Sequence, residues 1–365
     1  MSSAIAQLND YGQSPWYDNL SRTLLQGGGL AKLVSDDGIR GVTSNPTILD
    51  KAIEKGEGYD EQLVQCASDG MSIEDTYWAV VLRDIVAATD VLRPVHQATG
   101  GLDGFVSVEV SPELAHDTDG TKEAAQSLFV RVDRPNVMIK IPGTLEGLRA
   151  IEDTIAAGIN VNVTLIFSLE RHEKVIAAYQ KGLTRLAATG GDLSTVHSVA
   201  SFFVSRVDTE TDRRLPEGHA LRGKAAVANA KLAYELFQQR FAGSDWDALA
   251  AKGANLQRPL WASTSTKNPA YPSTLYVDEL IGPNTVNTMA DASIDALLEG
   301  EGNQRADSVT EGVDDARAAL SGLADAGVDF ADVTDTLERE GVDSFADSYR
   351  DALDTIEKRR AEITT

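Results

Sequence analysis

The sequence contains little cysteine and histidine. Cys66 is the single cysteine in 365 residues, which excludes an internal disulfide, a thiolate metal cluster and an iron–sulfur site. The five histidines are scattered along the chain and show no HxH or HExxH spacing. A metal-activated mechanism therefore has little support from the sequence.

Long apolar runs and an excess of positive charge are also absent. No apolar run approaches the roughly 20 residues of a membrane-spanning helix, and the opening residues lack the basic-then-apolar pattern of a secretory signal. The net charge of -23 repels polyanions, which argues against binding to nucleic acid or to an anionic membrane. With 42% hydrophobic residues, we expect a soluble globular protein and, by default, a cytoplasmic location. An anionic small substrate would need basic groups gathered locally.

Short β-rich runs alternate with helix-like stretches along most of the chain. Eight candidate strands cover residues 14–18, 39–45, 104–110, 136–142, 159–167, 197–204, 258–264 and 284–289. This alternation indicates parallel strands joined by crossover helices. Eight such units predict an α/β fold of the (β/α)8 TIM-barrel type, with an open doubly wound sheet as the alternative.

The helical patterns also predict how the chain is organised. We expect a single barrel domain over residues 1–365, with extra helices within about 208–255, where residues 225–243 have helical periodicity. After Met289 the chain is rich in alanine and aspartate. We expect C-terminal helices over about 291–365 that pack on the barrel.

Polar residues occupy one face of three central strands. Glu109, Lys140, Asn162 and Thr164 alternate with valine, isoleucine and leucine, and the last strand places Val161, Val163 and Leu165 on the other face. Because side chains alternate with a period of two, the apolar face should meet the helices and the polar face the barrel interior. The four polar residues should meet near the carboxyl ends of the strands, where barrel enzymes place their chemistry.

The same parity groups further residues in pairs. It allows each of four pairs to face inward: Trp16 with Asp18, Thr43 with Asn45, Ser201 with Phe203, and Trp261 with Ser263.

A lysine inside a barrel has a specific chemical use. Burial lowers the pKa of a lysine from roughly 10.4 by up to several units, and the neutral amine can condense with a carbonyl to form a Schiff base. This chemistry also needs groups that move protons, and Glu109, Thr164 and Asp18 are of the right types. The amides of Asn45 and Asn162 are suited to holding sugar hydroxyls.

Each of these residues also has a purely structural interpretation. Lys140 alone is more typical of a snorkelling or salt-bridged group, with Glu109 as its ion-pair partner. Asn45 precedes Pro46 and is equally typical of a turn or a helix cap, and Asp18 is placed to cap the following helix. Asn162 and Thr164 also form an N-x-T sequon, which we interpret as a chance match.

Several motifs together resemble transaldolases of the longer bacterial type, in the class I aldolase superfamily. They extend from about Trp16 to Met289 and are WYDNLSR, GVTSNPTI, VSVEVSPELAHD, VMIKIPGTLEGLRAIE, GINVNVTLIFS, ASFFVSRVD and WASTSTKNP. The resemblance implies a barrel and no cofactor. It implies transfer of dihydroxyacetone from sedoheptulose 7-phosphate to glyceraldehyde 3-phosphate, giving erythrose 4-phosphate and fructose 6-phosphate in the non-oxidative pentose phosphate pathway.

The resemblance also implies roles for individual residues. Lys140 would form the Schiff base, Asp18 would be the acid/base for carbon–carbon cleavage, and Glu109 and Thr164 would position a proton-shuttling water. The remaining site residues would bind substrate. Asn45, Asn162 and Ser201 would contact the dihydroxyacetone unit, Phe203 would line the pocket, and Arg206, Ser263 and Lys267 would hold the phosphate. In many relatives a second arginine stands where this sequence has Lys267, which is a point charge rather than a planar fork.

Two rival functions remain at this point. A fructose 6-phosphate aldolase would release free dihydroxyacetone; in that branch a glutamine usually replaces Glu109 and a tyrosine replaces Phe203, so this sequence favours transfer. A non-catalytic sugar-phosphate-binding protein would keep Arg206 and Lys267 but would have no use for an inward lysine beside a glutamate. The sequence leaves the oligomeric state open, a homo-oligomer included.

Overall fold

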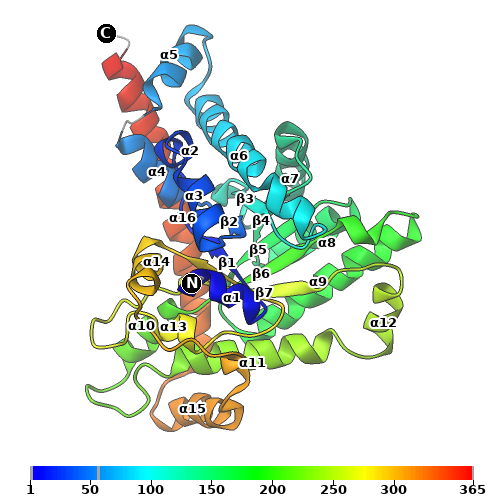
Figure 1. Cartoon of the computed structure of the whole chain (residues 1–365), viewed down its shortest axis with the longest axis vertical. Coiled ribbons are helices and arrows are strands. Elements are labelled where there is room, and N and C mark those ends of the chain that lie inside the picture. Colours follow the sequence, from blue (N-terminus) through cyan, green and yellow to red (C-terminus); the bar gives the residue numbers. More distant parts are fainter. Residues whose placement is uncertain (1–2, 56–57, 364–365) are drawn as a thin grey trace.

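Eight parallel strands form a closed barrel in the computed structural model, which describes residues 3–55 and 58–363 (Figure 1). Each strand pairs with the next in chain order, and β8 pairs with β1. This confirms the (β/α)8 barrel and rules out the open sheet. The strands are β1 (Gln13–Tyr17), β2 (Gly41–Val42), β3 (Phe105–Glu109), β4 (Val137–Pro142), β5 (Val161–Ile166), β6 (Ser198–Phe203), β7 (Gln257–Ala262) and β8 (Thr285–Met289).

Helices surround the barrel. Those as far as β6 are α1 (Ala4–Asp10), α2 (Arg22–Gln26), α3 (Gly29–Asp37), α4 (Pro46–Glu54), α5 (Asp60–Ser68), α6 (Ile73–Ala98), η1 (Pro112–Leu114), α7 (Thr118–Val132), α8 (Leu145–Ala156), α9 (Leu169–Ala188) and η2 (Leu193–Thr195). The later ones are α10 (Ser205–Arg214), α11 (Ala225–Arg240), α12 (Ser244–Ala250), α13 (Leu275–Asp278), α14 (Asp291–Leu298), η3 (Ser308–Thr310), α15 (Val313–Asp325) and α16 (Phe330–Ile363). Across the described ranges, we find no helix with both the length and the apolarity needed to span a bilayer.

The strand register places the central polar residues side by side. Glu109 of β3 is level with Lys140 of β4, and Lys140 is level with Asn162 of β5. Residues that are level on neighbouring parallel strands point to the same face. The three side chains therefore form one layer inside the barrel, while the valines and isoleucines between them are buried beneath the helices.

Charged and polar side chains close the amino end of the barrel. Arg258 pairs with Asp103 at 2.9 Å and also donates to Ser14. Trp16 donates from its indole nitrogen to the same Asp103. This buried cluster lies at the bottom of the barrel, and the largest group of polar cavity residues lies at the opposite, carboxyl end.

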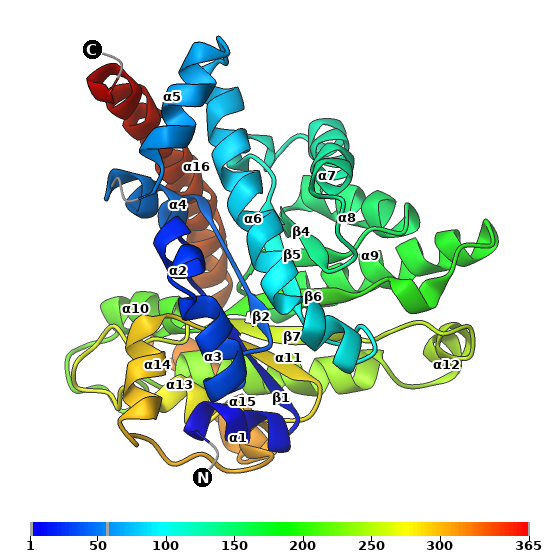
Figure 2. The same cartoon turned by 45° about the horizontal axis from the view of Figure 1, so that its top comes forward.

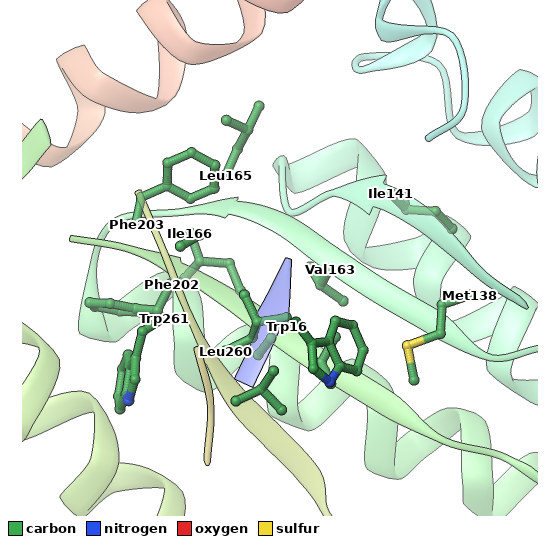
Figure 3. Close-up of a cluster of buried hydrophobic side chains, with 14 of the residues drawn as sticks. Trp16, Met138, Ile141, Val163, Leu165, Ile166, Phe202, Phe203, Leu260 and Trp261 are labelled. Carbon is green, nitrogen blue, oxygen red and sulfur yellow. The ribbon is translucent and has the colours of Figure 1, made fainter. Parts of the chain in front are cut away.

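Two strand ends depart from the predicted alternation. Leu165 has a left-handed backbone with φ of 59°, and the register of β5 against β6 shifts between Val163 and Ile166. As a result Leu165 does not continue the face of Val163, and lies beside Phe203 under α16 (Figure 3). Trp261 points outward, against expectation: its indole donates to the Leu280 carbonyl, and its ring packs edge-on against the outward Phe202.

The segments after β1 and β2 each contain two short helices. Residues 21–37 form α2 and α3, which are separate because Gly28 between them adopts a φ of 72° that favours glycine. Helices α4 and α5 follow β2 and precede the long helix α6.

The long helix α16 crosses the carboxyl end of the barrel. It packs against α4, α5, α6 and η1, which follow β2 and β3, and against α10, which follows β6. Both cartoon views show it running beside α4 and α5 (Figures 1 and 2). The C-terminal helix therefore covers the open end of the barrel, beyond packing on its outer wall.

Candidate active site

A cavity of about 610 Å³ opens at the carboxyl ends of the strands. Its walls include nine of the eleven site residues named from the sequence: Asp18, Asn45, Lys140, Thr164, Ser201, Phe203, Arg206, Ser263 and Lys267. The other two, Glu109 and Asn162, lie behind this wall and contact residues that line it. The predicted residues are therefore gathered in one place.

Lys140 is buried and paired with a carboxylate. Its Nζ lies 3.0 Å from Oε2 of Glu109, and the two residues are 5% and 7% exposed. Nζ also donates to the Ser44 carbonyl at 3.4 Å. Burial raises the pKa of Glu109, while the positive charge of Lys140 acts against that rise. The pair therefore places a carboxyl oxygen, which can accept a proton, directly beside the amine.

Asn162 is fixed by two neighbours inside the barrel. Its Nδ2 donates to the Ser107 hydroxyl at 3.0 Å, and its Oδ1 accepts from Ser201 at 2.7 Å. Asn162 is completely buried, and Ser201 carries this chain of hydrogen bonds to the cavity wall. The Thr164 hydroxyl, on the same face of β5, is buried without a partner among the described residues. It is therefore free to bind a water or a ligand at the cavity.

Asp18 follows β1 and enters the cavity from the opposite wall. Its Oδ1 accepts from the Thr43 hydroxyl at 2.6 Å, and that hydroxyl also meets Thr288 of β8. Burial raises the pKa of Asp18; the Thr43 hydrogen bond and the charges of Lys140 and Arg206 lower it in part. The helix after Asp18 is capped by Ser21, so Asp18 does not have the capping role that its position allowed.

Asn45 has the capping role that its position before Pro46 indicated. Its side-chain oxygen accepts from the backbone nitrogen of Ile48 at 3.0 Å, which satisfies the first turn of α4. The residue also lines the cavity. Because the cap occupies Oδ1, the amide nitrogen is the atom that Asn45 can offer to a ligand.

Positive charge gathers on the side of the cavity formed after β6 and β7. Arg206 is the second residue of α10, and its guanidinium lies 5.3 Å from the centre of the Phe203 ring. Burial lowers the pKa of Arg206. Ser263, at the end of β7, has a left-handed φ of 56°, and its hydroxyl is 2.9 Å from that of Ser205. Lys267 completes this wall.

The structure adds cavity residues that sequence reasoning did not identify. Phe345 of α16 lines the cavity, and its ring centre lies 5.2 Å from Nζ of Lys140. Lys51 of α4 and Lys55, the residue that follows this helix, add positive charge to the wall. The segment around Phe345 has the ordinary pattern of an amphipathic helix, so no local signal distinguished this residue from core residues such as Val342.

Sequence comparisons agree with this geometry. The family model described as Transaldolase/Fructose-6-phosphate aldolase matches residues 15–356. The chain is 51% identical to a transaldolase of Thermobifida fusca, with 100% of both chains covered. It is 52% identical to a transaldolase of Acidothermus cellulolyticus, covering 96% of this chain and 95% of that protein. It is also 50% identical to transaldolase 1 of Streptomyces avermitilis, over 96% of this chain and 94% of that protein.

Proposed function

Because the chain belongs to the transaldolase/fructose-6-phosphate aldolase family and is a transaldolase, we propose that Lys140 forms a Schiff base with a ketose phosphate. The donor is sedoheptulose 7-phosphate and the acceptor is glyceraldehyde 3-phosphate. The products are erythrose 4-phosphate and fructose 6-phosphate. The observation that carries this proposal is the buried pair of Lys140 and Glu109 in the wall of the cavity.

Imine formation begins when Glu109 takes a proton from the amine of Lys140. The neutral Nζ then attacks the ketone carbon of the donor. The carbinolamine loses water once a proton is delivered to its hydroxyl group, and Glu109 holds that proton. The free hydroxyl of Thr164 supports a water between Glu109 and the substrate.

Asp18 serves the carbon–carbon bond. As a base it takes the proton from the C4 hydroxyl of the bound donor while the C3–C4 bond breaks. The bonding electrons move into the iminium and give an enamine, and erythrose 4-phosphate leaves. In the reverse sense the enamine carbon attacks the acceptor aldehyde, whose oxygen receives the proton from Asp18. The raised pKa of Asp18 suits a group that must hold this proton between the two half-reactions.

The basic wall binds the phosphate. Arg206 offers a planar fork for two phosphate oxygens, and Lys267 adds a second positive charge. Ser263 supplies a hydroxyl from the end of β7. At the other end of the substrate, Asn45, Asn162 and Ser201 hold the hydroxyls of the dihydroxyacetone unit, with Asn162 kept in place by Ser107.

A coupled assay with sedoheptulose 7-phosphate tests the proposal. We expect erythrose 4-phosphate to form only when glyceraldehyde 3-phosphate is present, beyond one equivalent per active site. Sustained release of dihydroxyacetone without acceptor would instead indicate an aldolase. Borohydride reduction with the donor, followed by peptide mass spectrometry, should place the added mass on Lys140. Substrate binding without any trapped adduct would favour a non-catalytic sugar-phosphate-binding protein.

A further inference from the structure

Phe345 is the point at which the C-terminal helix enters the cavity. The residue is 4% exposed and lines the same cavity as Lys140. Its ring centre lies 5.2 Å from Nζ, while Glu109 contacts Nζ at 3.0 Å through a hydrogen bond. A phenyl ring at this distance attracts a cation through its π face and offers no proton to donate.

Close packing and polar contacts fix α16 at this position. Gly341, one turn before Phe345, lies so near the barrel that a Cβ atom there would stand 2.9 Å from Cδ2 of Leu165. Ser348 meets Thr47 of α4 at 2.7 Å, and Thr355 donates to Asp50 of α4 at 2.9 Å. Helix α16, which carries Phe345, is therefore held against the rest of the protein both before and after this residue.

Two phenyl groups then enclose the site of the covalent intermediate. Phe203 comes from the end of β6 and packs at 5.1 Å against the ring of Phe167. Phe345 comes from α16, on the side of the open end of the barrel. The enamine of the transfer reaction has a nucleophilic carbon that can also accept a proton. Once a proton donor has protonated this carbon, it can no longer attack the acceptor aldehyde. An apolar cover over the lysine keeps that donor away.

We propose that Phe345 is a specificity-determining residue that shields the three-carbon fragment on Lys140 from protonation by water. This inference rests on the proposed function, because it requires the enamine on Lys140. Through Phe345, α16 would help to determine whether the three-carbon fragment is transferred to the acceptor or released as dihydroxyacetone. The cation–π contact also favours the positively charged iminium that precedes and follows the enamine.

Phe345 suppresses a side reaction in which the enamine is protonated and free dihydroxyacetone is released. Water gives a proton to the nucleophilic carbon of the enamine, which becomes the iminium of dihydroxyacetone and leaves hydroxide. A second water adds to the iminium carbon, the C–N bond breaks, and dihydroxyacetone leaves while Nζ of Lys140 is restored. The hydroxide regains the proton that Asp18 took from the donor, and the water that hydrolyses the iminium replaces the water released when the imine formed. The overall change therefore converts the donor into erythrose 4-phosphate and free dihydroxyacetone, with no net use of water. No acceptor aldehyde is used.

The test compares Phe345→Leu and Phe345→Ala with the wild-type chain. Each protein receives sedoheptulose 7-phosphate with and without glyceraldehyde 3-phosphate, and the ratio of dihydroxyacetone released to fructose 6-phosphate formed is measured. We expect this ratio to rise from wild type through Leu to Ala, by about tenfold or more for Ala, which corresponds to about 1.4 kcal/mol between the two barriers. In deuterium oxide, the released dihydroxyacetone should carry one carbon-bound deuterium.

Ile356→Ala is the matched control, because Ile356 is fully buried on the same helix but does not line the cavity. Its ratio should equal that of the wild type. An unchanged ratio in a folded Phe345→Leu or Phe345→Ala chain would overturn the proposal, as would an equal rise in Ile356→Ala. Phe345→Leu keeps an apolar side chain in the core. The ratio can therefore still be measured in this variant if Phe345→Ala does not fold. If the wild-type chain shows neither transfer nor imine trapping, the proposed function itself is wrong. This result differs from an unchanged ratio in the Phe345 variants and from an equal rise in Ile356→Ala.

Discussion

Glu109 lies 3.0 Å from the Nζ of Lys140 and is the only carboxylate that an ion pair joins to this lysine within the described chain. Replacing Glu109 with Gln keeps the shape of the pair but removes the group that accepts the proton. We expect Glu109→Gln to slow borohydride trapping of the donor by roughly 10²- to 10⁴-fold, the range typical of general acid/base groups. Trapping at the wild-type rate would show that Glu109 is an electrostatic partner of Lys140 and does not transfer protons during imine formation.

Lys140→Ala should abolish turnover and leave the barrel folded. Removing the ammonium leaves Glu109 buried without its partner, but the raised pKa of this carboxyl group allows it to be neutral. We expect circular dichroism close to that of the wild type and no trapped adduct. Transferase activity that survives in this variant would show that another amine is the nucleophile.

Asp18→Ala should separate imine formation from bond cleavage. Since Asp18 contacts Thr43 rather than Lys140, the amine can still react with the donor ketone. We expect normal trapping of the donor, with erythrose 4-phosphate appearing roughly 10²- to 10⁴-fold more slowly in a single turnover. If the Asp18→Ala variant no longer traps the donor, Asp18 instead contributes to substrate binding.

Arg206→Lys should weaken the use of phosphorylated acceptors. A lysine keeps the charge but loses the two parallel donors, and a charged hydrogen bond contributes about 1.5–3 kcal/mol. We therefore expect kcat/KM for glyceraldehyde 3-phosphate to fall roughly 10- to 100-fold, with little change for unphosphorylated glyceraldehyde. Arg213→Lys is the control, because Arg213 lies on the same helix and pairs with Glu210 outside the cavity. Equal losses with both acceptors would contradict a phosphate contact.

His172 makes the fold sensitive to acid. The residue is fully buried with no partner on either ring nitrogen among the described residues, and burial lowers its pKa from 6.5 to about 4. As the pH falls below about 6.5 the unfolded chain binds this proton first. The free energy of unfolding should then drop by up to about 3 kcal/mol by pH 4.

His172→Leu removes that titration, so its stability should fall less over the same pH range. Thermal unfolding at intervals between pH 7 and 4 measures the difference. The control is His116→Leu, because His116 is exposed and pairs with Glu146 at the surface. Parallel curves for the His172 variant and the wild type would show that other groups govern the acid response.

The alternation of side chains was the strongest source of information in the sequence. Because each strand has a period of two, the polar positions of β3, β4 and β5 could be assigned to the interior without knowledge of contacts, and Lys140 pairs there with Glu109. The rule fails where the backbone leaves the regular strand. Leu165 and Ser263 have left-handed backbones, and the residue types around them do not predict this.

The contribution of α16 could not be predicted from the sequence for a different reason. Its amphipathic pattern shows that one face is buried, but which surface it covers depends on contacts with segments far away in the chain. Thr355 meets Asp50, and Arg359 meets Asp60, across most of the length of the sequence. Such pairings depend on the completed barrel, so Phe345 could be placed in the cavity only from the structure.

The position of Phe345 in the sequence also sets the order in which the parts of the active site are synthesised. The ribosome has made every barrel strand by Met289, and domains begin to fold while the chain is still growing. Lys140 and Glu109 are therefore synthesised well before Phe345, the side chain that covers them. If the barrel folds before the final helix emerges, the amine of Lys140 has no such cover until α16 docks.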